Sequence, residues 1–399
     1  MKKTICIIGA GASGITILEK LIKHIDKFQV ICYEKQDWIG GIWHPLHLTH
    51  TYPGMILNGS KEDFDLLNPK IEDVLKQKVD NFFSKEVYYK YLITKVKTNN
   101  IDKFIKFNHR MEICKYSTEI KKFEVTVQNE HTVYNKFFDY VIVANGIYTI
   151  ENKLKDELQV LISNFKGKIF HSKYLYQNNN FHNKKILIIG GGPSAEDVAL
   201  HAINQKAKSI TINSKNDWIV SSKWPKIINF ENKIINIDQN LVIYDSNNKE
   251  NIDIIILCIG YNHDLNFLNQ YNNLSFDNTF YYNLYDSIFH IDNPQLMFIG
   301  YIDPFFSLVL FEHQAEYIIK YLIQEIVLPN KAEMYKSMNI WKEKSMTLKD
   351  ERYDKGKLIV EYLNNINKIT KRQLETKELL NQINIEFNKK EKNILNFKK

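Results

Sequence analysis

The sequence is short of glycine. It has 15 glycines in 399 residues, whereas average usage of roughly 7% would give about 28. Because the composition is otherwise skewed towards Lys, Asn and Ile, we expect glycine to persist mainly where a side chain does not fit. All but two of the glycines, Gly54 and Gly356, fall in a few recognisable segments. Those segments therefore mark places where the backbone approaches a ligand or turns sharply.

Long apolar runs, paired cysteines and blocks of like charge are also missing. No run reaches the roughly 18 apolar residues that a membrane span needs, so no span is predicted. Cys6, Cys32, Cys114 and Cys258 are isolated, which excludes disulfide frameworks, zinc ribbons and dithiol redox centres and favours a reducing, cytoplasmic location. The 53 basic and 46 acidic residues give a net charge of +7 but are mixed along the chain. No nucleic-acid motif accompanies them, so no nucleic-acid partner is expected.

The first informative segment joins a short apolar strand to a glycine-rich turn. Residues 4–8 lead into the pattern G-x-G-x-x-G, formed by Gly9, Gly11 and Gly14. The strand must turn at the first glycine, the backbone must approach a pyrophosphate at the second, and a helix must pack on the strand at the third. The N-terminus of that helix, where Ser13 lies, then faces the phosphates. The segment predicts a dinucleotide site.

The residues after the next strand indicate which dinucleotide binds there. Residues 29–33 read as a strand that ends in Glu34, whose carboxylate can accept hydrogen bonds from a ribose. The paired glycines Gly40 and Gly41 would let backbone amides crowd against a flat, bulky cofactor, and Trp43 offers a ring face beside it. On its own this segment could be an ordinary turn with a core tryptophan. Together with the upstream fingerprint it favours FAD over NAD.

A second fingerprint follows further along the chain. Residues 185–189 form a buried-strand pattern that leads into Gly190, Gly192 and Ala195. This is G-x-G-x-x-A, in which alanine is the permitted small third residue. Two dinucleotide sites in one chain imply that one dinucleotide passes electrons to the other.

The strand after this second fingerprint ends without an acid. Residues 209–213 are followed by Ser214 and Lys215. A hydroxyl and a cation suit the 2′-phosphate of NADP, whereas an Asp or Glu would repel it. The alternative is that Lys215 is a solvated surface lysine. The position at the end of the strand favours NADP.

Three further strand-to-glycine junctions, at residues 139–146, 253–261 and 296–303, fit chain crossings between two nucleotide domains. The predicted fold class is α/β, with two Rossmann-like dinucleotide-binding domains, the NADP domain inserted in the FAD domain, and C-terminal helices. The expected domains are residues 1–150 and 256–330 for FAD, residues 151–255 for NADP, and residues 331–399 for a C-terminal helical extension.

The motifs together resemble those of a known family. Phe165, Gly167 and His171 match an F-x-G-x-x-x-H-S signature just before the second fingerprint. With both fingerprints and the Gly40-Gly41-x-Trp43 segment, the sequence resembles class B flavin-dependent monooxygenases, specifically the flavin-containing monooxygenases and their bacterial trimethylamine monooxygenase group. The resemblance implies that NADPH reduces FAD by hydride transfer and that reduced flavin captures O2 as a C4a-hydroperoxide. A soft nucleophile, an amine nitrogen or a sulfur, would then be oxygenated.

The resemblance also implies roles for individual residues. Asn58 would be the catalytic residue beside the flavin, where its amide can donate and accept hydrogen bonds. His171, with Phe165 and Gly167, would act in domain linkage and cofactor positioning rather than in proton transfer. Phe305 and Phe306 would line the substrate side, or would simply be core residues. The cofactor-binding residues implied by motifs and resemblance are Gly9, Gly11, Ser13, Gly14, Glu34, Gln36, Gly41, Ile42, Trp43, Asn58, Gly190, Gly192, Pro193, Ser194, Ala195, Ser214, Lys215 and Gln314.

Several alternatives stay open. His44, His47 and His50 have no acid or cysteine pattern nearby, so no metal site is predicted. Leu175 stands where the family has an aromatic residue, and residues 43–58 form a shorter segment than expected. A second hypothesis is Baeyer-Villiger oxygen insertion beside a ketone, but the resemblance implies a Trp after the signature histidine in such enzymes, and Leu175 does not match it. Leu175 and the short segment keep a third hypothesis open, a non-oxygenating NADPH oxidase or redox-sensing flavoprotein. The expected partner is a small-molecule substrate, and the C-terminal helices leave a homodimer possible.

Overall fold

The computed structural model describes residues 2–47, 49–67, 69–178, 180–214, 219, 223–271, 273–276, 279–302, 306–348, 353–372, 376–392 and 394–395. The chain forms two compact units. The first unit contains Met1–Pro45, Gly54–Ile147 and Asp264–Ile383, and the second contains Leu46–Pro53, Tyr148–His263 and Asn384–Lys399.

The first unit is built on a seven-stranded sheet with the order β18-β19-β20-β7-β1-β2-β3. The strands from β20 to β3 run parallel, and β18 and β19 extend the sheet antiparallel. Strand β1 has neighbours on both sides and both of its faces are buried, so its apolar residues run without alternation. The strands are β1 (Lys3–Ile8), β2 (Phe28–Tyr33), β3 (Ile105–Lys106), β7 (Tyr140–Val143), β18 (Leu284–Tyr285), β19 (Phe289–His290) and β20 (Leu296–Phe298).

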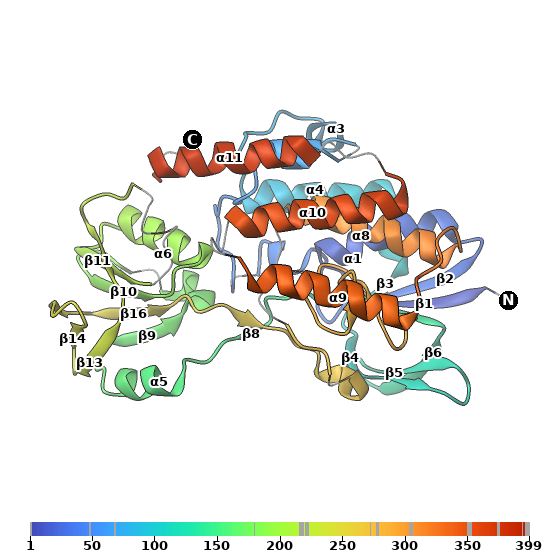
Figure 1. Ribbon diagram of the computed structural model, residues 1–399, viewed down its shortest axis with the longest axis horizontal. Helices are drawn as coiled ribbons and strands as arrows, with labels where there is room; N and C mark the ends of the chain where they lie inside the picture. Colours follow the sequence, from blue (N-terminus) through green and yellow to red (C-terminus); the bar gives the residue numbers. More distant parts are fainter. Residues whose placement is uncertain are drawn as a thin grey trace. The chain divides into compact units, whose positions relative to one another are not determined.

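Two layers cover this sheet. On one side lies a three-stranded antiparallel sheet of β4 (Arg110–Ser117), β5 (Lys122–Gln128) and β6 (Val133–Phe138). Its apolar residues share a core with β1 and β7. On the other side α1 packs on β1 and against α8, which in turn packs against α10 (Figure 1).

Among the helices of the first unit, α1 begins at the first fingerprint. They are α1 (Ala12–Leu21), α2 (Lys61–Asp65), α3 (Ile71–Leu75), α4 (Lys85–Thr98), α8 (Ser307–Leu322), α9 (Lys331–Met346), α10 (Tyr353–Thr370) and the first part of α11 (Thr376–Lys392). The short 3-10 helices are η1 (Ile22–His24), η2 (Gly41–Trp43), η3 (Asp102–Phe104) and η6 (Asn266–Tyr271).

The second unit has an all-parallel five-stranded sheet with the order β12-β11-β10-β16-β9. Helix α6 (Pro193–Asn204) covers one face, and α5 (Asp156–Ser163) and a small antiparallel sheet cover the other. The strands are β8 (Ile150–Glu151), β9 (Lys168–His171), β10 (Lys185–Ile189), β11 (Ser209–Asn213), β12 (Ile228–Glu231), β13 (Ile234–Asp238), β14 (Leu241–Tyr244), β15 (Lys249–Asn251), β16 (Ile254–Leu257) and β17 (Tyr261–Asn262). The 3-10 helices are η4 (Ser172–Tyr174) and η5 (Tyr176–Asn178).

The predicted fold class is confirmed: two Rossmann-like α/β units, the second inserted in the first, with helices at the C-terminus. The division into units differs in detail from the expected boundaries. Strand β16 pairs with β10 and β9, so residue 256 belongs to the second unit, which continues to His263. Residues 46–53 also pack in the second unit, although they interrupt the sequence of the first.

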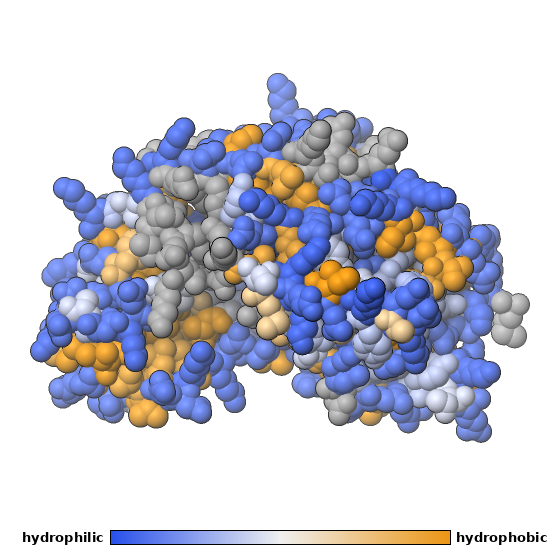
Figure 2. Space-filling model, in the orientation of Figure 1, coloured by the Kyte–Doolittle hydropathy of each residue, from blue (hydrophilic) through white to orange (hydrophobic). Residues whose placement is uncertain are grey.

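The visible surface is mostly hydrophilic (Figure 2). On the second unit the exposed apolar side chains include Val160, Ile169 and Ile235. Within the described ranges, no helix combines the length and the apolar character needed to cross a membrane.

Candidate cofactor sites

The first fingerprint is a turn with no room for side chains. Gly9 has a left-handed φ of +101°, and a Cβ there would lie 2.7 Å from the backbone oxygen of Ala144. A Cβ on Gly14 would overlap the carbonyl oxygen of Gly9. Gly11 is the N-cap of α1, and Ser13 is buried in the first turn of that helix. The first N–H groups of α1, which have no acceptor within the helix, therefore lie where a pyrophosphate would bind.

Glu34 is tied to the same loop. It is buried, its Oε2 accepts a hydrogen bond from the Ala10 N–H at 2.7 Å, and its Oε1 accepts one from the Gln36 N–H at 2.9 Å. Burial raises the pKa of Glu34, and the two backbone donors partly oppose that shift. Each carboxylate oxygen retains a lone pair, so the group can still accept from a ribose hydroxyl.

The segment with paired glycines closes over the fingerprint. The Gly40 N–H donates to the Ala10 carbonyl at 2.9 Å, and a Cβ on Gly41 would lie 3.3 Å from the Cα of Gly11. Ile42 and Trp43 follow in η2, where the Trp43 ring meets the Tyr88 ring edge-on at 4.8 Å. Two glycine loops that are distant in sequence thus face each other with bare backbone, which fits a dinucleotide held between them.

An unsatisfied donor lies in the same segment. The Trp38 indole stacks on the His44 ring at 4.7 Å, and its Nε1 is buried without an acceptor among the described residues. A buried N–H needs a partner. A cofactor with carbonyl or ring-nitrogen acceptors could supply one.

Asn58 follows a short antiparallel pairing. The Leu57 N–H donates to the Phe83 carbonyl at 3.0 Å, and the Lys85 N–H donates to the Met55 carbonyl at 2.8 Å. Asn58 is half-buried directly after this pairing and shortly before α2. The backbone that carries its amide is therefore held on one side by an isolated antiparallel bridge between Ile56 and Ser84 and on the other by helix α2.

Gln314 is fully buried on α8 and both of its polar atoms are used inside the protein. Its Oε1 accepts from the Gly300 N–H at 2.8 Å, and its Nε2 donates to the Tyr362 hydroxyl at 2.9 Å. A Cβ on Gly300 would lie 3.4 Å from the Cβ of Ser13. The structure therefore connects the predicted cofactor residue Gln314 to the fingerprint helix through Gly300.

The second fingerprint repeats the turn with one difference. Gly190 has a left-handed φ of +119°, and a Cβ there would overlap the carbonyl oxygen of Cys258. Gly192 is the N-cap of α6, and a Cβ on it would meet nothing within 4 Å. Pro193 starts the helix, Ser194 is half-buried, and Ala195 is fully buried at the third position. The open space before Gly192 fits a second dinucleotide.

Ser214 lies at the end of β11 and is buried. Its N–H donates to the Glu231 carbonyl at 3.0 Å. The Glu231 carboxylate is turned to other partners, accepting from the Ser246 hydroxyl at 2.8 Å and the Asn248 amide at 2.7 Å. Lys215, the predicted cation, lies outside the described residues.

The signature histidine is held by backbone on both sides. The His171 Nδ1 accepts from the Lys173 N–H at 3.1 Å, and in the tautomer this implies, Nε2 donates to the Gly260 carbonyl at 3.1 Å. Burial lowers the pKa of His171, which favours the neutral ring. A Cβ on Gly167 would overlap the Phe165 ring. The whole signature is thus packed tightly, as a positioning role requires.

Sequence reasoning missed the role of residues 46–53 as part of the second unit. The His50 N–H donates to the Lys173 carbonyl at 3.1 Å, and its ring lies 4.9 Å from the Tyr261 ring. The Tyr52 ring lies 5.4 Å from the His201 ring. The aromatic character of this apparent loop is the one signal that could have revealed it. Within the described ranges, no three His, Cys, Asp or Glu side chains gather as a metal site would require.

On the predicted substrate side, Phe306 is the N-cap of α8 and has a left-handed φ of +56°. Phe305 lies outside the described residues. The structure therefore places one of these two rings, at the start of the helix that carries Gln314.

The chain is similar to known flavin monooxygenases along most of its length. The profile of a family described as flavin-binding monooxygenase-like matches residues 2–228 and 225–386. The chain is 29% identical over 357 residues to a trimethylamine monooxygenase from Pelagibacter sp., covering 84% of this chain and 79% of that protein. It is similar to the crystal structure of Tmm from Pelagibacter sp. with a TM-score of 0.90 and 26% identity, covering 99% of this chain and 92% of that one. An S-allyl-L-cysteine S-oxygenase from Allium sativum shares the fold with a TM-score of 0.83 at 19% identity, covering 99% and 95%.

Proposed function

Because the chain belongs to the flavin-binding monooxygenase-like family and is a flavin-dependent monooxygenase, we propose that it uses NADPH and O2 to oxygenate a soft nucleophile. The nucleophile is the nitrogen of a small alkyl amine or the sulfur of a thioether. The observation that carries the proposal is the presence of two dinucleotide fingerprints, one per unit, with different strand-end residues, Glu34 and Ser214. The relative named trimethylamine monooxygenase supports the amine.

FAD is assigned to the first unit. The turn of Gly9, Gly11 and Gly14 would hold the pyrophosphate, Glu34 would accept from the ribose, and Gly41 would let the backbone approach the ring system. When bound, the flavin supplies the redox and oxygen chemistry, and the protein orients it and keeps water away.

NADPH is assigned to the second unit. The first turn of α6, beginning at Gly192 and Pro193, offers its N–H groups to the pyrophosphate. Ser214 and Lys215 at the end of β11 would receive the 2′-phosphate. His171 would position this unit through its two backbone hydrogen bonds.

Asn58 is the proposed catalytic residue beside the flavin. Its amide can donate and accept at once, so it can hold the oxygen that is transferred. We expect Asn58→Ala to keep FAD bound but to release hydrogen peroxide in place of product, because one hydrogen bond of about 1 to 3 kcal/mol is lost. Peroxide and product measured per NADPH consumed report the coupling. Unchanged coupling would remove Asn58 from the chemistry.

The test of the function is product analysis with purified protein, FAD, NADPH and air. Trimethylamine, dimethyl sulfide and cyclohexanone are supplied separately, and NADPH use, peroxide and product are measured. An N-oxide or a sulfoxide formed in proportion to NADPH supports the proposal. A lactone from cyclohexanone alone would instead favour Baeyer-Villiger chemistry, and stoichiometric peroxide with all three would favour an oxidase.

A further inference from the structure

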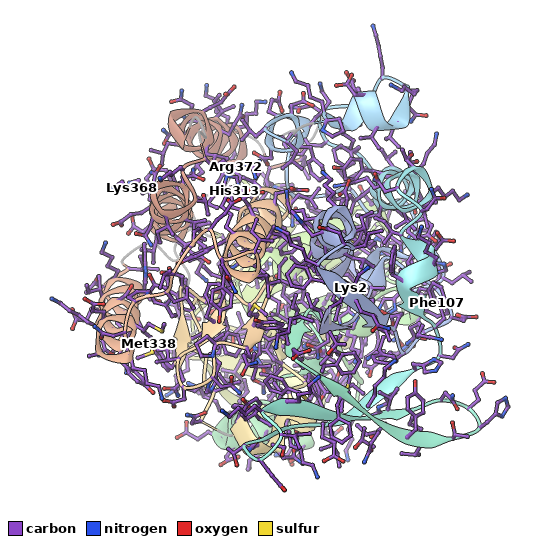
Figure 3. All side chains as sticks on the ribbon, turned by 90° about the vertical axis from the view of Figure 1, so that its right-hand side faces the viewer. Lys2, Phe107, His313, Met338, Lys368 and Arg372 are labelled. Atoms are coloured by element: carbon purple, nitrogen blue, oxygen red, sulfur yellow. The ribbon has the colours of Figure 1, made fainter. Side chains whose placement is uncertain are left out.

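Tyr362 on α10 joins two parts of the first unit through one hydroxyl. The residue is fully buried. Its hydroxyl accepts from the Gln314 Nε2 at 2.9 Å and donates to the backbone oxygen of Asp286 at 2.6 Å. Helices α8 and α10 lie side by side, as Figure 3 shows with His313 marking α8 and Lys368 marking α10. A single O–H is therefore shared between helix α8 and the turn that joins β18 to β19.

That turn needs to be held in place. Asp286 and Ser287 are consecutive non-glycine residues with left-handed φ values of +49° and +51°. The Ile288 N–H donates to the Tyr285 carbonyl at 3.0 Å, so Asp286 and Ser287 are the two central residues of a β-turn. Turns with a left-handed backbone at both central residues favour Asn-Gly, because a side chain is disfavoured there. Besides the Tyr362 hydroxyl, the Asn365 Nδ2 donates to the Asp286 Oδ1 at 3.4 Å. Both of these hydrogen bonds come from α10, so this helix helps to hold the turn, together with Tyr317 on α8 and Trp341 on α9.

In the other direction the connection ends at the fingerprint. Gln314 holds the N–H of Gly300, whose φ is +80°. A Cβ on Gly300 would lie 2.9 Å from the Phe311 ring and 3.4 Å from the Cβ of Ser13. Ser13 lies in the first turn of α1. The end of β20 thus packs directly on the turn that would hold the pyrophosphate, and Gln314 sets its position.

We propose that Tyr362 is a positioning residue for the flavin, acting through Gln314 and Gly300 on the first turn of α1. The inference rests on the proposed binding of FAD by the first unit. In this proposal the C-terminal helix α10, which carries no fingerprint residue, contributes to the affinity of the protein for FAD. A purely structural tyrosine would affect unfolding but not the affinity of the folded protein for FAD.

The test compares Tyr362→Phe with Tyr244→Phe in the full-length protein after removal of flavin. Tyr244 is a matched control, because it is buried in the second unit and its hydroxyl also donates a hydrogen bond inside the protein, to the Glu250 Oε1 at 2.6 Å. FAD affinity is measured by titration of flavin fluorescence, and the melting temperature of the apoprotein is measured in parallel. Loss of a hydrogen bond worth about 1 kcal/mol corresponds to roughly a fivefold weaker FAD affinity.

We expect Tyr362→Phe to raise the Kd for FAD about fivefold and Tyr244→Phe to leave it unchanged. Gln314→Met removes the middle of the connection and should weaken FAD binding similarly, and the double variant should be no worse than the stronger single one, because both act through one chain of contacts. If Tyr362→Phe does not fold, Gln314→Met carries the same expectation. Wild-type FAD affinity in folded Tyr362→Phe or Gln314→Met overturns the inference alone. A wild-type protein that binds no FAD overturns it together with the proposed function.

Discussion

Both fingerprints form a tight turn between a strand and a helix, but they differ in whether the third position of the motif has room for a side chain. In the first unit the third position is Gly14, where a Cβ would overlap the Gly9 carbonyl. In the second unit the same position is Ala195, which is fully buried and carries its methyl group without conflict. The helix therefore approaches its strand more closely in the first unit. Whether the third residue of the motif is Gly or Ala therefore indicates how closely the helix packs on its strand.

The strand ends differ as well. Glu34 in the first unit is locked by two backbone donors, Ala10 and Gln36. Ser214 in the second unit uses its N–H on the neighbouring strand, at the Glu231 carbonyl. One site thus presents a fixed acceptor and the other a hydroxyl without charge. This contrast is the physical basis for assigning a ribose contact to the first and a phosphate contact to the second.

The largest expected effect comes from giving the first fingerprint the residue of the second. Gly14→Ala should lower the free energy of unfolding by about 3 kcal/mol or more, because α1 must move away from β1 to make room for the methyl group. The purified variant should retain no FAD. Urea unfolding and the flavin content of the purified protein measure both effects. The reciprocal change, Ala195→Gly, should cost only about 1 kcal/mol, the price of a flexible helix residue. Equal losses of unfolding free energy in the two variants would show that the two helices pack equally closely on their strands.

A second contrast concerns buried carboxylates. Glu231 in the second unit accepts hydrogen bonds from Ser246 and Asn248. Asp286 in the first unit is surrounded by uncharged groups, and burial raises its pKa to about 7. The groups that face it are Tyr285 on β18, Tyr317 on α8, Trp341 on α9, and Tyr362 and Asn365 on α10.

The raised pKa predicts a pH dependence of stability. Between about pH 4 and pH 7 the folded protein keeps a proton on Asp286 that the unfolded chain has released. The free energy of unfolding therefore falls as the pH rises through this range, and the destabilisation by Asp286 is complete above pH 7. Asp286→Asn should therefore stabilise the protein by on the order of 2 kcal/mol at pH 8, with a smaller gain at pH 5. Thermal unfolding across this range measures the difference. Asp292→Asn is the matched control, since its exposed carboxylate pairs with Lys331, and it should bring no such gain.

The sequence predicted those parts of the fold that depend on residues close together in the chain. Gly9, Gly14 and Gly190 mark turns because their left-handed backbone or their close packing excludes a side chain. Parallel buried strands were visible as apolar runs, so the two-unit α/β fold followed. By contrast, Gln314 and Tyr362 meet through side chains that are distant in sequence, and no local pattern announces such a contact. The second-unit position of residues 46–53 was missed because the aromatic rings of His50 and Tyr52 indicate packing but not the residues, Tyr261 and His201, that they pack against.

A smaller effect is expected from Glu34→Gln. An amide can replace only one of the two carboxylate oxygens as an acceptor, so either the Ala10 or the Gln36 N–H faces another donor. FAD affinity should fall about tenfold, for a loss of about 1.4 kcal/mol. NADPH affinity should be unchanged, and titration of each cofactor separately measures this. A parallel loss of both would mean that Glu34 supports the general stability of the protein rather than one cofactor.

The smallest expected effect tests the second unit at the matching strand end. Ser214→Asp places an acid where the first unit has Glu34. Two unit charges about 4 Å apart repel by about 1 kcal/mol when water screens them as in bulk solvent, so we expect a carboxylate there to repel the 2′-phosphate of NADPH by about this amount. The Kd for NADPH should rise about fivefold while that for NADH, which lacks this phosphate, stays the same. Ser214→Asn, similar in size and uncharged, is the control. If Ser214→Asp weakened the binding of NADH and NADPH equally, the end of β11 would not recognise the 2′-phosphate. The two strand ends would then differ in packing alone.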